Sequence, residues 1–380
     1  MTWSEKGLLT PATLIFPQYK NLKINDPIMK KMNAAVLTEY RKVEWKSVDI
    51  PSVSGNEVLI RIGYACICGS DQHVFLGEFH PRTTLPLIQG HEFAGTIVET
   101  GPEVKRYKRG DRVAVDPIIW CGHCPACKRH HYPACTTLKL VGIDLDGGFS
   151  EYMKVPETML YRVTDNIPDE HAAMVEVLSI GFHACKRAGV KSGDSVVIWG
   201  AGKVGQSILQ ALKTKTQNTV IMVDILDERL AIAKKTYPDV NIINAASTNA
   251  VDNIKELTSG EGVDIAFEAV GHATDLPGVL NPVRGCIQAI RGGGTVCVLG
   301  LSSEPSPVVM KELIWKEGMI MTSRVSHGEF AETIENLNRG TLKPDALVTD
   351  ILHPSKTQQA FEMLEEEPRK HLKILLKFKE

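Results

Sequence analysis

The stretch "VVIWGAGKVGQSILQALK", residues 196–213, predicts the fold of about half the chain. A short apolar run leads into glycines at positions 200, 202 and 205, and a helical pattern follows. In this spacing Gly200 permits a tight turn, Gly202 lets the backbone approach a pyrophosphate, and Gly205 lets helix and strand pack closely. The helix N-terminus then offers unpaired N–H groups to phosphates. The stretch therefore predicts a dinucleotide-binding loop.

Asp224 supports this interpretation because it ends the next apolar run, 19 residues after Gly205. A carboxylate there can accept hydrogen bonds from both ribose hydroxyls and repels a 2′-phosphate, which favours NAD over NADP. The alternative is an aspartate that caps the helix beginning at "DERLAIA". Lys203 and Val204, within the loop, and Arg229, after Asp224, are further candidates for cofactor contact.

Six apolar runs alternate with helical patterns in this part of the chain, which predicts a parallel sheet. Near-continuous apolar strands, separated by crossovers of ten or more residues, are typical of a sheet covered on both faces. The expected class is a doubly wound α/β fold. The runs are "SVVIWG", "TVIMVD", "VNIINA", "VDIAFEAV", "TVCVLG" and "GMIMTS".

The part before Pro168 has a different texture, with short β-rich segments and frequent turns. A helix is expected from Pro168 to a stop at Gly189. The last apolar run, "HLKILLKF", is assigned back to the first domain. The expected domains are 1–32, an apolar extension that packs on the surface or on a partner subunit; 33–170, β-rich; 171–324, dinucleotide-binding; and 325–380, returning to the β-rich domain.

Composition limits the function. The chain of 380 residues has 43% hydrophobic residues and a formal charge of -2, without a long Lys/Arg block, which disfavours nucleic-acid and anionic-membrane partners. A small-molecule substrate is favoured. No apolar run reaches about 18 residues and no signal-peptide pattern opens the sequence, so a cytoplasmic protein is expected. The clustering of four of the nine cysteines indicates metal binding rather than disulfides.

Those four cysteines, Cys121, Cys124, Cys127 and Cys135, lie in "CGHCPACKRHHYPAC". Four thiolates saturate a tetrahedral zinc and leave no position for a substrate, so a structural site is expected. The neighbouring histidines are interpreted as solvated loop residues rather than ligands: His123, His130 and His131.

A second constellation contains Cys68, His91 and Glu92, with Glu176 a further candidate. One thiolate, one imidazole and one carboxylate give zinc three ligands and leave a fourth position open, which is typical of a catalytic site. The residues are too far apart for spacing alone to connect them.

Several motifs occur together in a recognisable order: "CGSDQH", "GHEFAGTIVETG", "GDRVAVDP", "CGHCPACKRHHYPAC", "GGFSEYMKVP", "EVLSIGFHA" and "GAGKVG". Over about residues 33 to 380 the chain resembles the zinc-dependent medium-chain dehydrogenases of the alcohol, sorbitol and threonine dehydrogenase superfamily. The resemblance implies a GroES-like catalytic domain with a structural-zinc lobe at about 118–140, and a Rossmann domain that binds NAD. It also implies one catalytic and one structural zinc per subunit, and a homodimer or homotetramer.

The resemblance assigns the catalytic zinc to Cys68 and His91. It leaves open whether Glu92 is a direct ligand or one that alternates with water. Glu176 falls where alcohol dehydrogenases have a cysteine and polyol dehydrogenases a glutamate, which can bind zinc, its water or a substrate hydroxyl. Val177 replaces the proline usual after it in polyol dehydrogenases.

Ser70 and His73 match the proton path of the family, in which a hydroxyl and an imidazole carry the alcohol proton to solvent. The structural alternative is a turn hydrogen bond and a surface histidine. The resemblance places Gly271 and Leu299 near the adenosine ribose and the nicotinamide. Arg324 falls at a substrate-pocket arginine of polyol dehydrogenases, although a surface salt bridge explains it equally well.

The expected reaction is the NAD-dependent oxidation of a secondary alcohol to a ketone, and Glu176 favours substrates with neighbouring hydroxyls: a sugar alcohol, sugar acid, polyol phosphate or vicinal diol. The alternatives are an L-threonine 3-dehydrogenase or a simple alcohol dehydrogenase. A non-catalytic dinucleotide-binding relative is disfavoured because the zinc-binding residues are intact.

Overall fold

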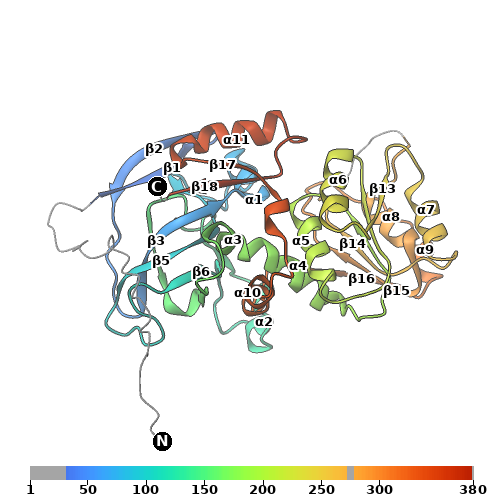
Figure 1. Ribbon diagram of the computed structural model, residues 1–380, viewed down its shortest axis with the longest axis horizontal. Coiled ribbons are helices and arrows are strands. Elements are labelled where there is room, and N and C mark those ends of the chain that lie inside the picture. Colours follow the sequence, from blue (N-terminus) through green and yellow to red (C-terminus); the bar gives the residue numbers. More distant parts are fainter. Residues whose placement is uncertain (1–30, 272–277, 379–380) are drawn as a thin grey trace, which may run out of the picture.

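The computed structural model describes residues 31–271 and 278–378, which form two halves lying side by side (Figure 1). Most of the predicted N-terminal extension, residues 1–30, lies outside the described residues. Strand β1 begins at Lys31, inside the stretch predicted as extension. Within the described ranges, no helix combines the length and hydropathy required to cross a membrane.

One half is built on a parallel sheet of six strands in the order β13-β12-β11-β14-β15-β16. Each strand falls on one of the six predicted apolar runs, so the predicted doubly wound fold is confirmed. The strand order reverses between β11 and β14, where such sheets open a crevice for ligands at the carboxyl ends of the strands. The strands are β11 (Val196–Trp199), β12 (Val220–Asp224), β13 (Asn241–Asn244), β14 (Val263–Glu268), β15 (Ile290–Val298) and β16 (Met319–Thr322).

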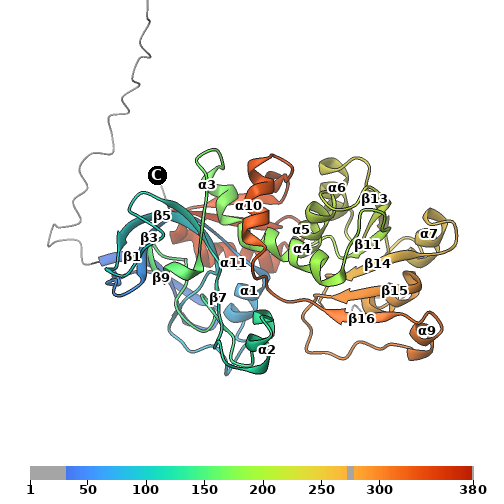
Figure 2. The ribbon, with the colours of Figure 1, turned by 90° about the horizontal axis from the view of Figure 1, so that it is seen from below.

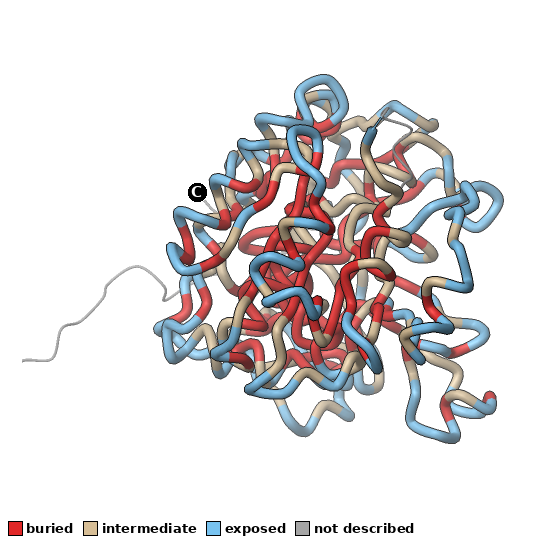
Figure 3. Tube along the Cα trace, turned by 90° about the vertical axis from the view of Figure 1, so that its right-hand side faces the viewer, coloured by how far each residue is buried: buried red, intermediate tan, exposed pale blue. Residues whose placement is uncertain are grey.

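Helices cover both faces of this sheet, which explains why its strands are apolar throughout. Alternate side chains of β11, such as Val196 and Ile198, face helices α4, α5 and α6. Val197 and Trp199 face α7, α8 and α9. The buried segments accordingly run through the centre of the molecule in Figure 3. The bounds are α4 (Val175–Ala188), α5 (Lys203–Leu212), α6 (Asp227–Thr236), α7 (Ala250–Leu257), α8 (Pro282–Ala289) and α9 (Met310–Ile314).

The other half is β-rich. Its main sheet has the order β10-β6-β5-β3-β18-β17 with β9 on β3, and smaller sheets have the orders β2-β1-β4 and β7-β8. The C-terminal strand β18 joins this half by pairing antiparallel with β3. The strands are β1 (Lys31–Glu39), β2 (Lys42–Asp49), β3 (Glu57–Cys66), β4 (Leu87–Ile88), β5 (Glu92–Thr100), β6 (Arg112–Val115), β7 (Ile118–Ile119), β8 (Lys139–Leu140), β9 (Tyr152–Pro156), β10 (Leu160–Arg162), β17 (Val348–Leu352) and β18 (Lys373–Lys377).

The halves meet across helices (Figure 2). The helix predicted from Pro168 to Gly189 is two helices, α3 (Asp169–Ala173) and α4, separated at Met174. The predicted stop is confirmed, because Gly189 ends α4 with a φ of 69°. Helix α4 packs on α5 and on α10 (Phe330–Asn338), and its core side chains belong to a cluster that spans both halves. Two further short helices and one longer one complete the β-rich half: α1 (Gly69–Phe75), α2 (Pro125–Lys128) and α11 (Thr357–Glu366).

Glu329, immediately before α10, connects that helix to α4. Its carboxylate is buried, accepts a hydrogen bond from Lys186 Nζ at 2.8 Å and lies 3.2 Å from His183 Nδ1. It also accepts the backbone N–H of His327 at 2.8 Å. Burial opposes ionisation, but His183 and Lys186 outweigh it and lower the pKa of Glu329 from 4.5 to about 2. The folded protein therefore stabilises the ionised carboxylate of Glu329 relative to the unfolded chain.

We expect Glu329→Gln to destabilise the protein by about 2 kcal/mol at pH 7. Because the folded pKa lies below the unfolded one, this stabilisation is present above about pH 4.5 and is lost as the pH falls towards 2. Urea unfolding of parent and variant at pH 7, 5 and 3.5 should therefore show a converging difference. Glu335→Gln, which removes an exposed carboxylate of α10, is the matched control. A difference independent of pH would contradict this role of Glu329.

Candidate active site and metal centres

The glycine loop has the geometry that its spacing predicts. Gly200 has a φ of 101°, and a Cβ added there would lie 2.8 Å from the Ala269 carbonyl oxygen. A Cβ at Gly205 would lie only 1.8 Å from the Gly200 oxygen, so α5 can approach β11 only with glycine here. Gly202 caps α5, and a Cβ added to it meets nothing within 4 Å. The backbone at Gly202 therefore faces open space at a helix N-terminus, as a phosphate site requires.

Asp224 fixes this loop against the end of β12. Its Oδ2 accepts the backbone N–H of Ala201 at 2.6 Å. Its Oδ1 accepts those of Ile225 at 2.8 Å and Leu226 at 3.0 Å. The N-cap of α6 is Leu226, so Asp224 is not the helix cap that the sequence left as an alternative. A carboxylate has about four lone-pair sites, so capacity remains for a ribose hydroxyl.

Two cofactor candidates reach from the parallel-sheet half to the β-rich half. Lys203 Nζ donates to the Ile67 carbonyl at 3.3 Å, and Arg229 Nη2 donates to the Pro368 carbonyl at 3.2 Å. Burial and the charge of Lys373 lower the pKa of Lys203. Each contact uses one donor of its cation, and the buried Nε of Arg229 has no hydrogen-bond partner among the described residues.

Val204, Gly271 and Leu299 lie at the carboxyl side of the sheet, where ligands bind in such folds. Val204 is in the first turn of α5, Gly271 follows β14 with a φ of 84°, and Leu299 directly follows β15. Their placement is consistent with the predicted contacts.

Cys68, His91 and Glu92 come together, although the sequence separates them. Each offers one ligand atom, and these atoms lie within 4.8 Å of one another. Cys68 caps α1, while Glu92 begins β5 directly after His91. A sulfur, a nitrogen and an oxygen donor form a set that zinc accepts. Glu92 Oε1 is buried without a hydrogen-bond partner among the described residues, so this oxygen is available to coordinate a metal.

Asp71 orients this cluster. It is fully buried; its Oδ2 accepts the Cys68 backbone N–H at 2.8 Å and its Oδ1 lies 3.3 Å from His91 Nδ1. Burial lowers the pKa of His91, but the charges of Asp71 and Cys68 outweigh it and raise the pKa well above its usual value. A carboxylate behind a ligating histidine fixes the ring orientation. Sequence reasoning missed this role, although Asp71 lies inside "CGSDQH".

Glu92 forms a buried ion pair with Lys373 of β18, and both side chains are fully inaccessible to solvent. Burial disfavours the ammonium, but Glu92 raises the pKa of Lys373 above its ordinary value. One carboxylate oxygen of Glu92 is thus held by Lys373. Sequence reasoning also missed Lys373, because 281 residues separate the partners.

Glu176 lies in the first turn of α4 and is buried, and its Oε2 has no hydrogen-bond partner in the described part of the chain. Burial and the nearby Glu92 raise its pKa to about 8. It is not part of the cluster formed by Cys68, His91 and Glu92. The structure therefore places Glu176 beside the predicted zinc site as a carboxyl group that can be protonated near neutral pH.

The predicted proton path starts at the cluster. Ser70 Oγ lies 3.2 Å from His91 Nε2. His73, on the same helix, is 42% exposed and contacts Glu78 Oε2 through Nδ1. Ser70 thus borders the cluster of Cys68, His91 and Glu92, and His73 reaches solvent. Arg324, predicted for the substrate pocket, is exposed on the segment after β16.

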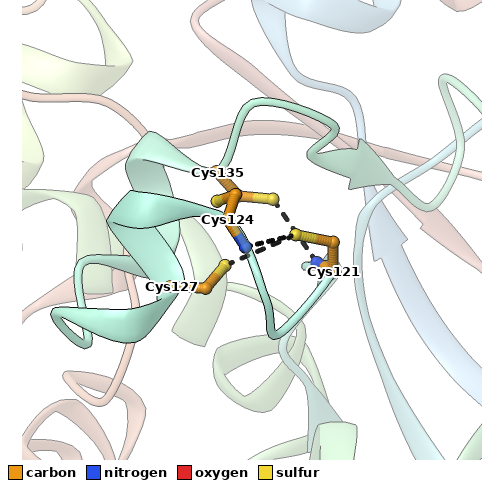
Figure 4. Close-up of side chains that lie close together, drawn as sticks. All are labelled: Cys121, Cys124, Cys127 and Cys135. Atoms are coloured by element: carbon orange, nitrogen blue, oxygen red, sulfur yellow. Dashed lines mark hydrogen bonds between the residues drawn. The ribbon is translucent and has the colours of Figure 1, made fainter.

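The four lobe cysteines, which could hold a metal ion, gather around one point in the lobe that contains α2 (Figure 4). The Cys121 and Cys127 sulfurs are 3.9 Å apart. Backbone N–H groups of Cys124 and Cys121 donate to the sulfurs of Cys121 and Cys135 at 3.3 and 3.4 Å. N–H donors of Cys127 and Thr136 lower the pKa of Cys124 to about 5. The lobe therefore favours the thiolate at Cys124, whereas burial and the bond to Cys124 raise the pKa of Cys127 to about 12.

The comparisons with known proteins agree with this geometry. Residues 54–165 match the alcohol dehydrogenase GroES-like domain, and residues 204–339 match the zinc-binding dehydrogenase family. The starvation-sensing protein RspB of Escherichia coli K12 is 32% identical over 335 residues, covering 87% of this chain and 95% of the relative. The chain belongs to the zinc-dependent medium-chain dehydrogenases.

Two further relatives of this dehydrogenase extend the match over nearly the whole chain. Sorbitol dehydrogenase of Bacillus subtilis is 31% identical over 359 residues, covering 92% of this chain and 98% of the relative. The crystal structure of RspB from Escherichia coli CFT073 in complex with NADH superposes with a TM-score of 0.83 at 30% identity, covering 92% and 99% of the two chains. As a family member, the dehydrogenase uses zinc and a nicotinamide dinucleotide.

We expect Cys127→Ser to reduce the zinc content of the dehydrogenase by about one ion per chain and its melting temperature by about 5–10 °C, because a closed tetrahedral site contributes directly to folding. Metal analysis and thermal unfolding measure both effects. Cys68→Ser is the matched control: it should lose activity with a smaller change in melting temperature. A Cys127→Ser protein with normal stability and lost turnover would contradict a structural lobe.

Proposed function

We propose that this dehydrogenase oxidises a secondary alcohol carrying neighbouring hydroxyl groups to a ketone, with NAD as hydride acceptor. The observation that carries the proposal is Glu176. Its buried carboxyl group lies beside the cluster of zinc-binding residues, lacks a partner in the described chain, and has a pKa raised to about 8. Such a group can donate a hydrogen bond to a second substrate hydroxyl or accept one from it. A substrate such as ethanol leaves it unsatisfied, which costs binding energy.

In the proposed reaction, one group of residues would hold zinc and another would transfer the proton. Cys68, His91 and Glu92 would hold zinc, which supplies Lewis acidity towards the alcohol oxygen when bound. Ser70 would accept the proton of the substrate hydroxyl while giving up its own, and His73, backed by Glu78, would take up the released proton and pass it to solvent.

The choice of NAD over NADP rests on Asp224, whose carboxylate lies where a 2′-phosphate would meet a like charge. The second zinc of each subunit would bind the four lobe cysteines and serve stability. Clustered thiols remain reduced in the cytoplasm, where we propose that the enzyme acts.

We also propose that the enzyme is an oligomer whose subunits meet at β16. This strand is an edge of the parallel sheet, and within the described ranges it pairs only with β15. Met319 and Ile320 expose apolar side chains along it, and neither lysine nor proline protects the edge. Ile314 and Trp315, shortly before β16 in the chain, are also exposed, Trp315 to 77%.

A second copy of the chain is the occupant that fits this edge. A two-fold axis would pair β16 with the partner's β16 antiparallel, so that the unpaired backbone groups and the same apolar side chains of both copies are satisfied together. The opposite edge, β13, begins and ends with asparagine and is unsuited to the same contact. A homotetramer would need a further interface besides this one.

The reaction is tested by measuring turnover of sorbitol, butanediol, gluconate, sorbitol 6-phosphate, threonine and ethanol, each with NAD and with NADP. We expect NAD-dependent turnover of one or more polyhydroxy compounds, with kcat/KM about 100-fold or more above that for ethanol, because the site contains a polar group that ethanol leaves unpaired. Glu176→Ala should narrow that ratio. Turnover restricted to threonine or ethanol would contradict the proposal, and equal use of NADP would contradict the role of Asp224.

The assembly is tested by sedimentation of an Ile320→Lys variant. We expect its mass to fall to that of a monomer, or of a smaller oligomer if two interfaces exist, because the lysine ammonium would be desolvated in the paired edge. Ile242→Lys on β13 is a close control, since the parent side chains are 39% and 38% exposed at Ile242 and Ile320, respectively. A monomeric parent protein, or an unchanged mass for Ile320→Lys, would exclude this interface.

A further inference from the structure

Lys203 joins the glycine loop of the parallel-sheet half to the β-rich half. It opens α5 directly after Gly202. In Figures 1 and 2 this helix lies on the side of the parallel-sheet half that faces the β-rich half. The Lys203 ammonium donates to the carbonyl of Ile67 at 3.3 Å, 136 residues earlier in the chain. A residue of the dinucleotide loop therefore contacts the backbone immediately before Cys68.

Ile67 and Cys68 are otherwise held by the β-rich half. The Ile67 side chain is fully buried, and its backbone N–H donates to the Ile374 carbonyl of β18 at 3.0 Å. Cys68 donates its own backbone N–H to Asp71 Oδ2 at 2.8 Å. The bond from Lys203 ties this segment to the other half. The position of the Cys68 sulfur relative to the glycine loop therefore depends in part on Lys203.

The Lys203 ammonium lies close to the charges of the proposed catalytic cluster. Burial and the positive charge of Lys373 lower its pKa, and nearby negative charges offset part of this effect, those of Cys68, Glu92 and Asp71. Lys373 is itself paired with Glu92. Lys203 has no ion pair with a carboxylate in the part of the chain that the structure describes. Its charge is thus not neutralised by a direct partner.

Lys203 also has more hydrogen-bonding capacity than the protein uses. An ammonium offers several N–H donors. Among the described residues it makes the single bond to Ile67, whose 3.3 Å exceeds the roughly 2.9 Å typical of such bonds. The backbone on both sides of the contact leaves room, because a Cβ added to Gly202 or to Gly69 meets nothing within 4 Å. A ligand at the start of α5 can therefore reach donors of this ammonium.

We propose that Lys203 is a positioning residue that couples the cofactor site to the catalytic metal site. In folds of this kind the negatively charged diphosphate of the cofactor binds at the N-terminus of the helix that Lys203 opens. Such an anion gives the ammonium further acceptors and holds it beside the Ile67 carbonyl. The backbone at Cys68 is restrained as a result.

This coupling goes beyond a contact between Lys203 and the cofactor, because it acts on a residue of the other half. Cofactor binding makes the metal harder to release, and by thermodynamic reciprocity a bound metal favours the cofactor. The inference rests on the proposed zinc ligands Cys68, His91 and Glu92. It does not depend on which alcohol the enzyme oxidises.

The test follows the loss of zinc from the loaded enzyme to excess EDTA, with and without NADH at a concentration that saturates each protein. Because Cys68 must move for the open site to release its metal, NADH should slow the loss of about one zinc ion per chain. In Lys203→Met this protection should be about tenfold smaller, the effect of one lost hydrogen bond to a charged group. Lys203→Met should also bind NADH about tenfold more weakly.

Three further variants make the test specific. Lys234→Met removes another ammonium–carbonyl bond of the parallel-sheet half, to Val240 at 2.9 Å, and should leave the protection by NADH unchanged. Lys203→Arg keeps the charge and the donors and should recover part of the protection. Lys203→Gln also lacks the charge and replaces Lys203→Met if that variant fails to fold. A melting temperature close to that of the parent excludes a general loss of structure.

The failures are distinguishable. Zinc loss that NADH does not slow in the parent, or slows equally in Lys203→Met, would overturn the coupling and leave the metal ligands standing. Weaker NADH binding by Lys203→Met with unchanged protection would reduce Lys203 to a cofactor contact and would also overturn the coupling. A Cys68→Ser protein that retains as much zinc as the parent would overturn the proposed metal site itself.

Discussion

The buried ion pair between Glu92 and Lys373 is the interaction on which the proposed catalytic centre depends. Removing two charges from water is expensive, and a lone buried charge costs several kcal/mol more than a paired one. Glu92 can therefore face Cys68 and His91 only because β18 brings an ammonium group behind it. Lys373 also lies 3.5 Å from the Ile67 carbonyl, which Lys203 of the glycine loop approaches as well. The segment that leads to Cys68, the glycine loop and the C-terminal strand β18 therefore meet at the Ile67 carbonyl.

The parts of the structure that local patterns determine could be predicted from the sequence. The glycine loop follows from the contacts a side chain would make at Gly200 and Gly205, and the six parallel strands follow from apolar runs buried on both faces. The four lobe cysteines lie close in sequence and in space. The break at Met174 and the half-exposed strands β2 and β17 were missed, since none has a strong apolar or glycine pattern.

The catalytic cluster could be predicted only through resemblance to a family, since Cys68 and His91 are joined by tertiary structure and not by spacing. Even then, the residues behind the ligands were absent from the prediction. Asp71 was hidden among ordinary turn residues, and Lys373 was read as part of an apolar strand. Glu176 was predicted as a possible ligand, and the structure places it next to the cluster, so its role as a ligand stays a prediction. Long-range electrostatic pairing leaves no periodicity that a single sequence can display.

The β-rich half is interrupted in the sequence by the parallel-sheet half, and this order has a consequence for biosynthesis. Glu92 emerges from the ribosome 281 residues before Lys373, and the whole parallel-sheet half is made in between. Until then its carboxylate has no buried counter-charge, so the nascent β-rich half must leave that region hydrated. The parallel-sheet half, by contrast, is contiguous and can collapse as it is made. The enzyme thus acquires its cofactor-binding scaffold before its catalytic pocket can close.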